Sequence, residues 1–363
     1  MAIQHMSFSF NPRYQHRQKM LLLFGMAVLL FICCIVSLSL GSANIPIKTI
    51  ITSLNPFSSG HPESNLQLII EKIRLPRVLL ALLIGATLAS CGTVTQGLFR
   101  NPLADPSLIG VSAGASIGAT IMIFLGTSWL GFTELSSSSI GISLVSIGAF
   151  LSALITVLLV YQLSTSANGT SVATMLLAGI AITALAGGFT SLLEYLSDSD
   201  ALRRISLWRM GGLDGANYSQ VTLMTFIVFA LCILFKRQST ALNALLLGES
   251  EARHLGIHIQ KTKLRLIILV AAGVGLSVAI AGGIGFIGLI VPHMMRLIIG
   301  PNHRYLIPAT LMAGAILLLL ADTLARTIIS PSELPVGVVT ALIGAPFFIS
   351  LLKSRYKYGM QEG

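Results

Sequence analysis

Charged residues are scarce in this sequence: Asp, Glu, Lys and Arg together make up 10% of its 363 residues. A soluble domain has about 25%, so the composition excludes an ordinary soluble surface. The hydrophobic content of 54% and the mean hydropathy of +0.85 indicate an integral membrane protein. Carboxylates are rarer still in the apolar runs, where only Glu194 and Asp322 lie near the ends. We expect both to cap a helix or to pair with a nearby Arg.

The scarcity of intramembrane carboxylates and the absence of catalytic motifs exclude or disfavour several classes of protein. Ion-coupled carriers usually keep buried carboxylates as proton or sodium sites, so an ion-coupled secondary transporter is disfavoured but stays an alternative. The phosphate loop GxxxxGK[ST], the nucleophile elbow and metal-ligand spacings are absent. We therefore expect no catalysis, no resident metal and no ATP hydrolysis by this chain. The aromatic and basic interleaving of single-strand binders is absent too, so we expect no nucleic-acid partner.

Ten apolar stretches are predicted to cross the membrane, given that a hydrocarbon core of about 30 Å needs roughly 20 residues per helix. They are residues 20–40, 78–98, 107–126, 140–162, 172–194, 219–236, 263–284, 286–299, 306–324 and 336–352. Because Lys and Arg favour cytoplasmic loops, both termini are expected in the cytoplasm. We therefore attribute the net charge of +10 to the basic residues that set the membrane topology and contact anionic lipid. We expect one all-α membrane domain over residues 1–363.

An internal repeat is visible when residues 81–110 are aligned with residues 271–300 at an offset of 190. The identical pairs are Ala81/Ala271, Gly85/Gly275, Ala89/Ala279, Gly92/Gly282, Pro102/Pro292, Ile109/Ile299 and Gly110/Gly300. The two segments run in opposite directions in the expected topology, which predicts an inverted repeat of helices 2–5 and 7–10. The stretch 286–299 is short and contains Pro292, so we expect protein to shield it or an aqueous path to run beside it.

Three arginines stand at the outer ends of spans: Arg74 and Arg77 before the second, and Arg326 after the ninth. Positive charge on this side opposes the usual bias. One interpretation is that the three side chains receive carboxylates through charge-assisted hydrogen bonds. The alternative is that these long side chains snorkel to the membrane interface.

A polar, mostly basic segment, residues 243–265, separates two apolar runs on the cytoplasmic side. Its pattern predicts two short helices, residues 243–247 and 251–257, broken around Gly248, with Gly256 as a helix end. A helix pair of this kind suits a groove in a soluble partner. A solvated loop is the alternative.

Several motifs together resemble one known family over nearly the whole chain. They are residues 74–77 (RLPR), 101–106 (NPLADP), 176–179 (LLAG), 247–249 (LGE), 252–257 (ARHLGI), 285–289 (GFIGL), 292–293 (PH) and 333–337 (ELPVG). The chain resembles permease subunits of type II ATP-binding-cassette importers, the uptake family for iron siderophores, haem and vitamin B12. The resemblance implies the fold of the B12-importer permease and a bacterial inner-membrane location.

The resemblance also implies partners. The permease would form a homodimer, with two cytoplasmic ATPase subunits that bind ATP and Mg and a periplasmic protein that delivers the substrate. No covalently bound cofactor is implied. In the B12-importer relative, arginines matching Arg74, Arg77 and Arg326 accept Glu side chains of the binding protein.

The family's coupling helices would correspond to residues 237–262. Their expected contacts with the ATPase are Gly248, Glu249, Ala252, Arg253 and Gly256. A cytoplasmic gate is implied at Asn101 and Leu103, with a second region before the fifth span around Val172.

The substrate is less closely defined by the resemblance. Residues 194–217 resemble the corresponding outer segment of haem permeases, and Arg203, Arg204 and Arg209 within them would attract the propionates of haem. Haem is therefore the first expectation. A ferric siderophore is the second, and vitamin B12 is an alternative within the family.

Overall fold

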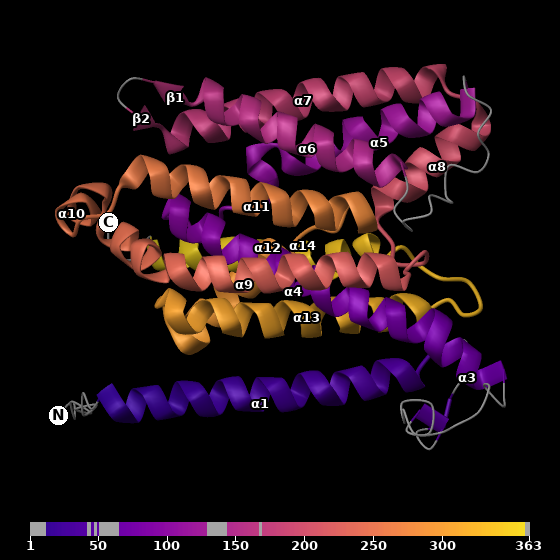
Figure 1. Cartoon of the computed structure of the whole chain (residues 1–363), viewed down its shortest axis with the longest axis horizontal. Helices are drawn as coiled ribbons and strands as arrows, with labels where there is room; N and C mark the ends of the chain where they lie inside the picture. Colours follow the sequence, from indigo (N-terminus) through magenta and orange to yellow (C-terminus); the bar gives the residue numbers. More distant parts are fainter. Residues whose placement is uncertain are drawn as a thin grey trace.

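The computed structural model describes residues 12–41, 45–46, 49–50, 65–128, 144–166 and 169–359. Its long helices lie side by side along the long axis of the molecule (Figure 1). They are α1 (Pro12–Ser39), α4 (Leu75–Phe99), α5 (Val111–Ser128), α6 (Leu144–Leu163), α7 (Val172–Leu196), α9 (Tyr218–Leu247), α11 (Ile259–Ala281), α12 (Ile287–Ile299), α13 (His303–Thr327) and α14 (Val336–Gly359).

Shorter elements connect these helices. They are α3 (Asn65–Ile69), the π-helical turn η1 (Ile70–Arg74), the 3-10 turn η2 (Pro106–Ile109), α8 (Ser199–Met210) and α10 (Glu249–His254). A small antiparallel hairpin, β1 (Thr165–Ser166) and β2 (Gly169–Thr170), precedes α7 and was not expected.

In the described part of the chain, seven helical segments are long and apolar enough to cross a membrane, and α5, α12 and α14 contain shorter apolar helices. All ten coincide with the expected spans, although residues 140–143 of the fourth span lie outside the described residues. The prediction of an all-α, multi-pass membrane protein is confirmed.

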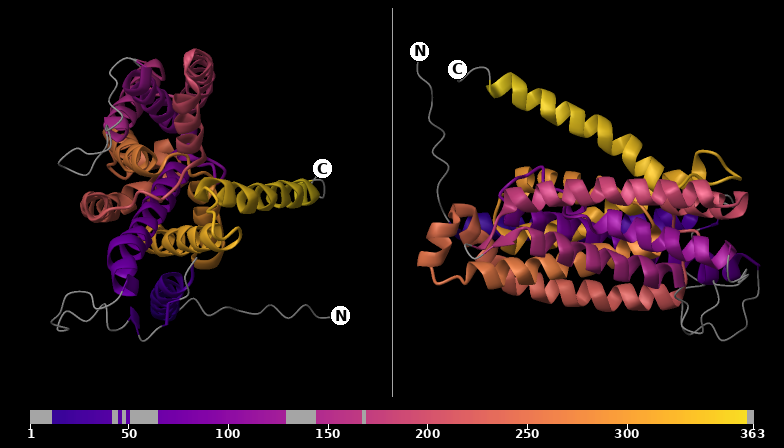
Figure 2. Two further views of the ribbon diagram at one scale, coloured as in Figure 1. Left: turned by 90° about the vertical axis from the view of Figure 1, so that its right-hand side faces the viewer. Right: turned by 90° about the horizontal axis from the view of Figure 1, so that it is seen from above.

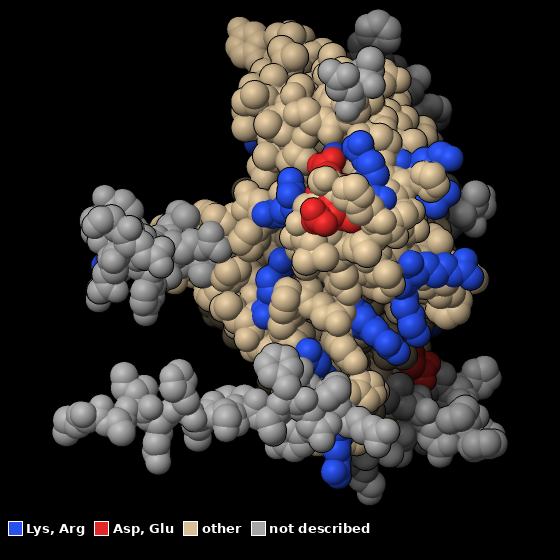
Figure 3. All heavy atoms as spheres, turned by 90° about the vertical axis from the view of Figure 1, so that its left-hand side faces the viewer, with Lys and Arg blue, Asp and Glu red and all other residues tan. Residues whose placement is uncertain are grey.

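The two ends of the bundle differ in charge. α10, the β1–β2 hairpin and the start of α1 lie at one end, and α3 and α8 lie at the other (Figure 1). Viewed onto the first of these ends, Lys and Arg side chains gather around a small acidic patch (Figure 3). The positive-inside rule therefore assigns this end to the cytoplasm.

The packing repeats between the two halves of the chain. Helix α4 packs on α12 and α13, as α11 packs on α5 and α6. The pair α5–α6 corresponds to α12–α13, and α7 contacts α5 and α6 as α14 contacts α12 and α13. Each of helices 2–5 thus has a counterpart with equivalent neighbours, which confirms the inverted repeat.

Helix α4 forms the buried centre of the bundle, and glycines bring its backbone against its neighbours. A Cβ added to Gly92 would meet the carbonyl of Gly288 on α12, and one added to Gly85 would meet the carbonyl of Gly314 on α13. Lipid offers no hydrophobic drive for helix association, so such close backbone contact is what holds these helices together.

Helix α12 is shielded as expected for so short a segment. Residues 287–293, its first two turns, are all buried. A Cβ on Gly288 would lie 3.2 Å from Pro106 of η2, the turn that leads into α5. The starts of α5 and α12 therefore approach each other inside the bundle.

The expectation of a separate short helix at residues 243–247 was wrong, whereas the expected break at Gly248 is confirmed. Helix α9 continues without interruption to Leu247, because no Gly or Pro stands between Lys236 and Gly248 and the segment is rich in Ala and Leu. Helix α10 begins at Glu249, two residues earlier than expected. The end at Gly256 is confirmed: with φ of +80°, its N–H bonds to Arg253 and that of Ile257 bonds to Ala252, which is a Schellman motif.

Candidate functional site

The outer arginine cluster comprises Arg74, Arg77 and Arg326. Its geometry begins at Pro76, which has no N–H and disturbs the helix ahead of it. The N–H of Leu75 bonds to the carbonyl of Ile70, an i→i−5 bond that makes η1 a π-turn. Arg74 ends η1 and Arg77 lies in the first turn of α4, and both are buried.

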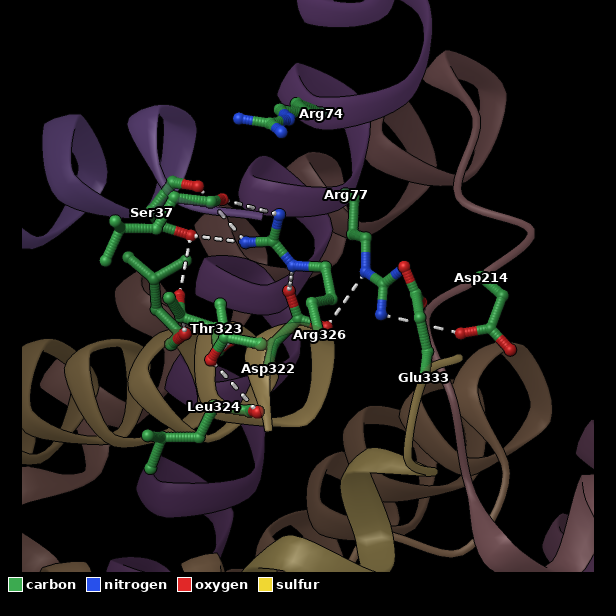
Figure 4. Close-up of polar contacts among 12 residues, drawn as sticks. Ser37, Arg74, Arg77, Asp214, Asp322, Thr323, Leu324, Arg326 and Glu333 are labelled. Carbon is green, nitrogen blue, oxygen red and sulfur yellow. Dashed lines mark hydrogen bonds and ion pairs between the residues drawn. The ribbon is translucent and has the colours of Figure 1, made fainter. Parts of the chain in front are cut away.

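Arg77 binds three carboxylates that come from separate parts of the chain (Figure 4). Its Nε lies 2.9 Å from Oδ1 of Asp322, and its Nη1 lies 2.6 Å from Oε2 of Glu333. Its Nη2 lies 3.5 Å from Oδ1 of Asp214 in the loop between α8 and α9. Arg77 therefore ties α4 to α13 and to the loops that precede α9 and α14.

Arg326 and Arg74 bind the outer end of α1. Arg326 donates from Nε to Oδ2 of Asp322 at 3.1 Å and from Nη2 to the hydroxyl of Ser37 at 2.9 Å (Figure 4). Arg74 donates from Nη1 to the carbonyls of Leu38 and Ser39 at 2.6 and 3.1 Å. The last carbonyls of a helix lack intrahelical partners and carry partial negative charge, so two guanidinium groups stabilise this helix end.

The cluster differs from the expectation of open, partner-facing charges. Arg74, Arg77 and Arg326 are only 4%, 6% and 5% exposed. The snorkelling alternative is wrong, because groups of the chain itself bind the guanidinium groups. The expected pairing of the rare intramembrane carboxylates is confirmed for Asp322, and for Glu194, which lies 2.7 Å from Arg209. Sequence reasoning missed Asp214 and Glu333, whose loop positions gave no sign of the contact.

The segment expected to contact the ATPase (residues 237–262, called the coupling segment) is connected to the hairpin before α7 by Lys263, which directly follows it. Nζ of Lys263 lies 2.8 Å from Oε1 of Glu249 on α10 and donates to the carbonyl of Thr170 at 2.9 Å. Oε1 of Gln260 accepts from the N–H of Thr170 at 3.1 Å. Lys263 is 3% exposed, so these contacts are largely shielded from water. They connect α10, the start of α11 and the hairpin in one polar network.

The exposed surface of the coupling segment is partly apolar. Leu247 and Leu255, on either side of α10, are 68% and 63% exposed, although this end of the molecule is cytoplasmic. Arg253 is exposed and makes no ion pair with a described carboxylate. Ala252 is fully buried, so its expected direct contact with a partner was wrong; it packs inside the chain and supports α10.

The expected gate residues lie in two places near the coupling segment: in the turn after α4 and at the start of α7. The side chain of Asn101 accepts from the N–H of Leu103 at 2.9 Å and fixes the turn after α4. Arg100, in this turn, reaches to 3.9 Å from the position of a Cβ on Gly248. Val172 begins α7, directly after the hairpin that Lys263 holds and the N-cap Ser171.

The outer helix α8 carries the three arginines expected to attract substrate. Arg203, Arg204 and Arg209 are all exposed. Arg204 pairs with Asp200 at 3.1 Å and Arg209 with Glu194 at 2.7 Å. Arg203 has no ion pair with a described carboxylate.

A cavity of about 460 Å³ lies where the two halves of the repeat meet. Asp105, the N-cap of η2, and Ser107 within η2 line it on one side, and Val278 of α11 and Phe286 of the turn before α12 line it as well. No group of three or more His, Cys, Asp or Glu side chains among the described residues is placed to hold a metal ion. The cavity therefore offers backbone, hydroxyl and apolar contacts, and the carboxylate of Asp105, to a visiting molecule.

The fold and these sites are those of a transport permease: an inverted repeat of membrane helices, a cavity between its halves and a short helix, α10, at the cytoplasmic end. The model of the FecCD transport family matches residues 29–354. The chain belongs to this family. Its members are permease subunits of type II ATP-binding-cassette importers in the inner membrane, and separate ATPase subunits hydrolyse the ATP.

Relatives of several specificities match over nearly the whole chain. The chain is 42% identical to a hemin transport permease of Yersinia pestis, covering 94% of this chain and 97% of the relative. It is 40% identical to a vitamin B12 import permease of Klebsiella pneumoniae, covering 93% and 95%. It is 38% identical to a molybdate import permease of Haemophilus influenzae, covering 94% and 98%.

A solved inward-facing structure of a metal-chelate type ABC transporter matches with a TM-score of 0.78 and 34% identity, covering 92% of this chain and 99% of that one. The family resemblance expected from the motifs is confirmed, and the ion-coupled alternative is set aside.

Proposed function

We propose that this permease imports haem into the cytoplasm as part of an ATP-driven complex. The observation that carries the choice of substrate is the set of exposed arginines on α8, where Arg203 has no ion pair with a described carboxylate and Arg204 and Arg209 are exposed too. Haem carries two propionate groups, which guanidinium groups bind well. The amide side chains of vitamin B12 offer no such charge. The hemin permease relative supports the same choice.

Uptake by the complete complex in proteoliposomes tests the substrate. Labelled haem should accumulate with ATP, and excess vitamin B12, molybdate or a ferric siderophore should not compete. The double variant Arg203→Gln/Arg204→Gln should lower kcat/KM for haem severalfold. Lys72→Gln, an exposed charge at the same end of the bundle, is the matched control. Transport of a siderophore or of vitamin B12 in place of haem would overturn the proposal.

The second part of the proposal is a homodimer that uses α7 and α14. A Cβ added to Gly187 or Gly188 on α7 would meet nothing within 4 Å, so this face is open to a closely approaching helix. Helix α14 leaves the bundle toward its C-terminal end (Figure 2). Gly188→Leu should weaken dimerisation, whereas Gly25→Leu on α1, which is equally open, should not. An unchanged dimer fraction in detergent would argue against this interface.

The third part concerns two ATPase subunits, which bind ATP and Mg. The coupling segment would seat α10 in a groove of each ATPase, with Leu247 and Leu255 as apolar anchors and Glu249 and Arg253 as polar contacts. Gly248 and Gly256 would shape the two turns. Replacing Glu249 and Arg253 together should leave ATP hydrolysis but reduce uptake. Normal transport by that variant would count against the assignment.

The fourth part is docking of the periplasmic binding protein on the outer arginine cluster. Glu333 and Asp214 are 36% and 73% exposed, whereas Asp322 is fully buried. Carboxylates of the binding protein would therefore replace the two exposed partners of Arg77 and leave Asp322 in place. Glu333→Gln should tighten docking at low salt, because it removes a competitor. Weaker docking of this variant would refute exchange at Arg77.

The transport cycle would then be alternating access. Asn101 and Leu103 on one side and Val172 on the other form the cytoplasmic gate in this proposal, and α10 moves them when the ATPases close. Binding of ATP must favour one state of the bundle over the other, since only differential affinity shifts a conformational equilibrium.

A further inference from the structure

A second hollow, unrelated to the transport path, lies on the membrane-facing surface between α1, α12 and α13. Its volume is about 390 Å³. Leu22 and Met26 of α1 form one wall, Met294 and Ile298 of α12 form the other, and Ala313 and Leu317 of α13 form the floor. Every one of these side chains is apolar.

The groove opens toward the cytoplasmic end of the bundle. On the α12 wall it runs from Val291 to Ile299, the last residue of that helix. At 1.5 Å per residue this wall is about 12 Å long, close to the roughly 15 Å that half a hydrocarbon core provides. The groove therefore matches one acyl chain of the cytoplasmic leaflet in length and in chemistry.

Positive charge stands at the cytoplasmic mouth of the groove. Nζ of Lys19 lies 3.9 Å from the position that a Cβ of Gly300 would take and 5.0 Å from the ring centroid of Tyr305. Nδ1 of His16 lies 2.8 Å from the hydroxyl of the same tyrosine. Lys19 thus spans from α1 to the corner between α12 and α13. It forms no ion pair with a described carboxylate.

We propose that this groove binds an anionic phospholipid, with one acyl chain between α1 and α12 and the phosphate on Lys19. The apolar walls alone would accept the chain of any lipid. The ammonium group at the mouth, which pairs with no described carboxylate, favours a lipid with net negative charge, because a basic residue near the membrane surface contributes about 1 kcal/mol of attraction to such lipids. The methionines in the walls adapt their shape to a flexible chain.

Native mass spectrometry of the full-length permease tests the proposal, after exchange into detergent with equal amounts of phosphatidylglycerol and phosphatidylethanolamine. Wild type should retain phosphatidylglycerol preferentially. Lys19→Gln should reduce that retention about fivefold, and Lys19→Arg should preserve it. Lys236→Gln, an exposed charge at the cytoplasmic part of α9, is the matched control. Ala313→Phe, which fills the floor of the groove, should reduce retention of both lipids.

Three outcomes would overturn the proposal. Equal retention of phosphatidylglycerol by Lys19→Gln and Lys236→Gln would show that Lys19 does not bind the headgroup. Unchanged retention by Ala313→Phe would show that lipid binds elsewhere. A disulfide between two copies carrying Met294→Cys would show that a second permease covers the groove instead.

Discussion

Replacing Lys263 by Met is expected to uncouple ATP hydrolysis from transport. Lys263 is the single side chain that contacts both Glu249 on α10 and Thr170 in the hairpin before α7, as judged from the polar contacts among described residues. Methionine has a similar length and no charge, so packing of this 3% exposed position is largely kept. The change removes the polar link between α10 and the hairpin before α7.

The size of the effect follows from the two contacts. Glu249 is 35% exposed, so water screens its ion pair, which is worth roughly 1 kcal/mol or less. The hydrogen bond from the charged ammonium group to the Thr170 carbonyl contributes about 1.5–3 kcal/mol. Couplings between distant sites are typically about 1–3 kcal/mol. Loss of the link should therefore reduce the substrate transported per ATP about tenfold or more.

The assay compares uptake and phosphate release in proteoliposomes that hold the permease, its ATPase and its binding protein. Lys261→Met is the matched control, since Lys261 is exposed and lies two residues before Lys263 on α11, on a different side of the helix. Glu249→Gln should have a smaller effect, because it leaves the bond to Thr170. Equal transport per ATP in Lys263→Met and Lys261→Met would refute the link. A parallel fall of ATPase activity, uptake and thermal stability would show that Lys263 serves folding only.

Two further predictions concern stability. Asp322→Asn leaves Arg77 and Arg326 buried without their shared carboxylate, so it should cost about 3–5 kcal/mol. Thermal unfolding in detergent measures this, and a loss no larger than that of Glu333→Gln would contradict it. Gly92→Ala places a Cβ against the Gly288 carbonyl and should cost about 1–3 kcal/mol. Gly25→Ala, with open space around it, should unfold like wild type.

The membrane fold could be predicted from the sequence because its signals are local. Lengths of apolar runs, the distribution of Lys and Arg, and the offset of 190 between similar segments need no knowledge of packing. The same reliance on apolar character produced the error in α9. Beyond Lys236 the helix leaves the membrane, its polarity rises, and the hydropathy signal ends although the helix does not.

The contacts within the candidate site were only partly predictable. Asp322 and Arg326 are four residues apart on one helix, so their pairing followed from helix geometry. The partners Arg77 and Asp322 are 245 residues apart, and Lys263 and Thr170 are 93 apart. Such pairs depend on how separate helices pack. A single sequence shows where the charged residues are, but it does not show which helices pack against each other.

The continuity of α9 gives a physical route between the two ends of the molecule. Its outer end is held near the arginine cluster: Asp214, just before it, binds Arg77, and the hydroxyl of Tyr218 donates to the carbonyl of Glu71 at 2.6 Å. A capping box at Asn217 fixes its first turn. Its 30 residues then span about 45 Å and end at Gly248, directly before α10. Because a continuous helix transmits displacement along its axis and a broken one does not, the proposed exchange of carboxylates at Arg77 and the proposed movement of α10 would act on the two ends of one rigid element.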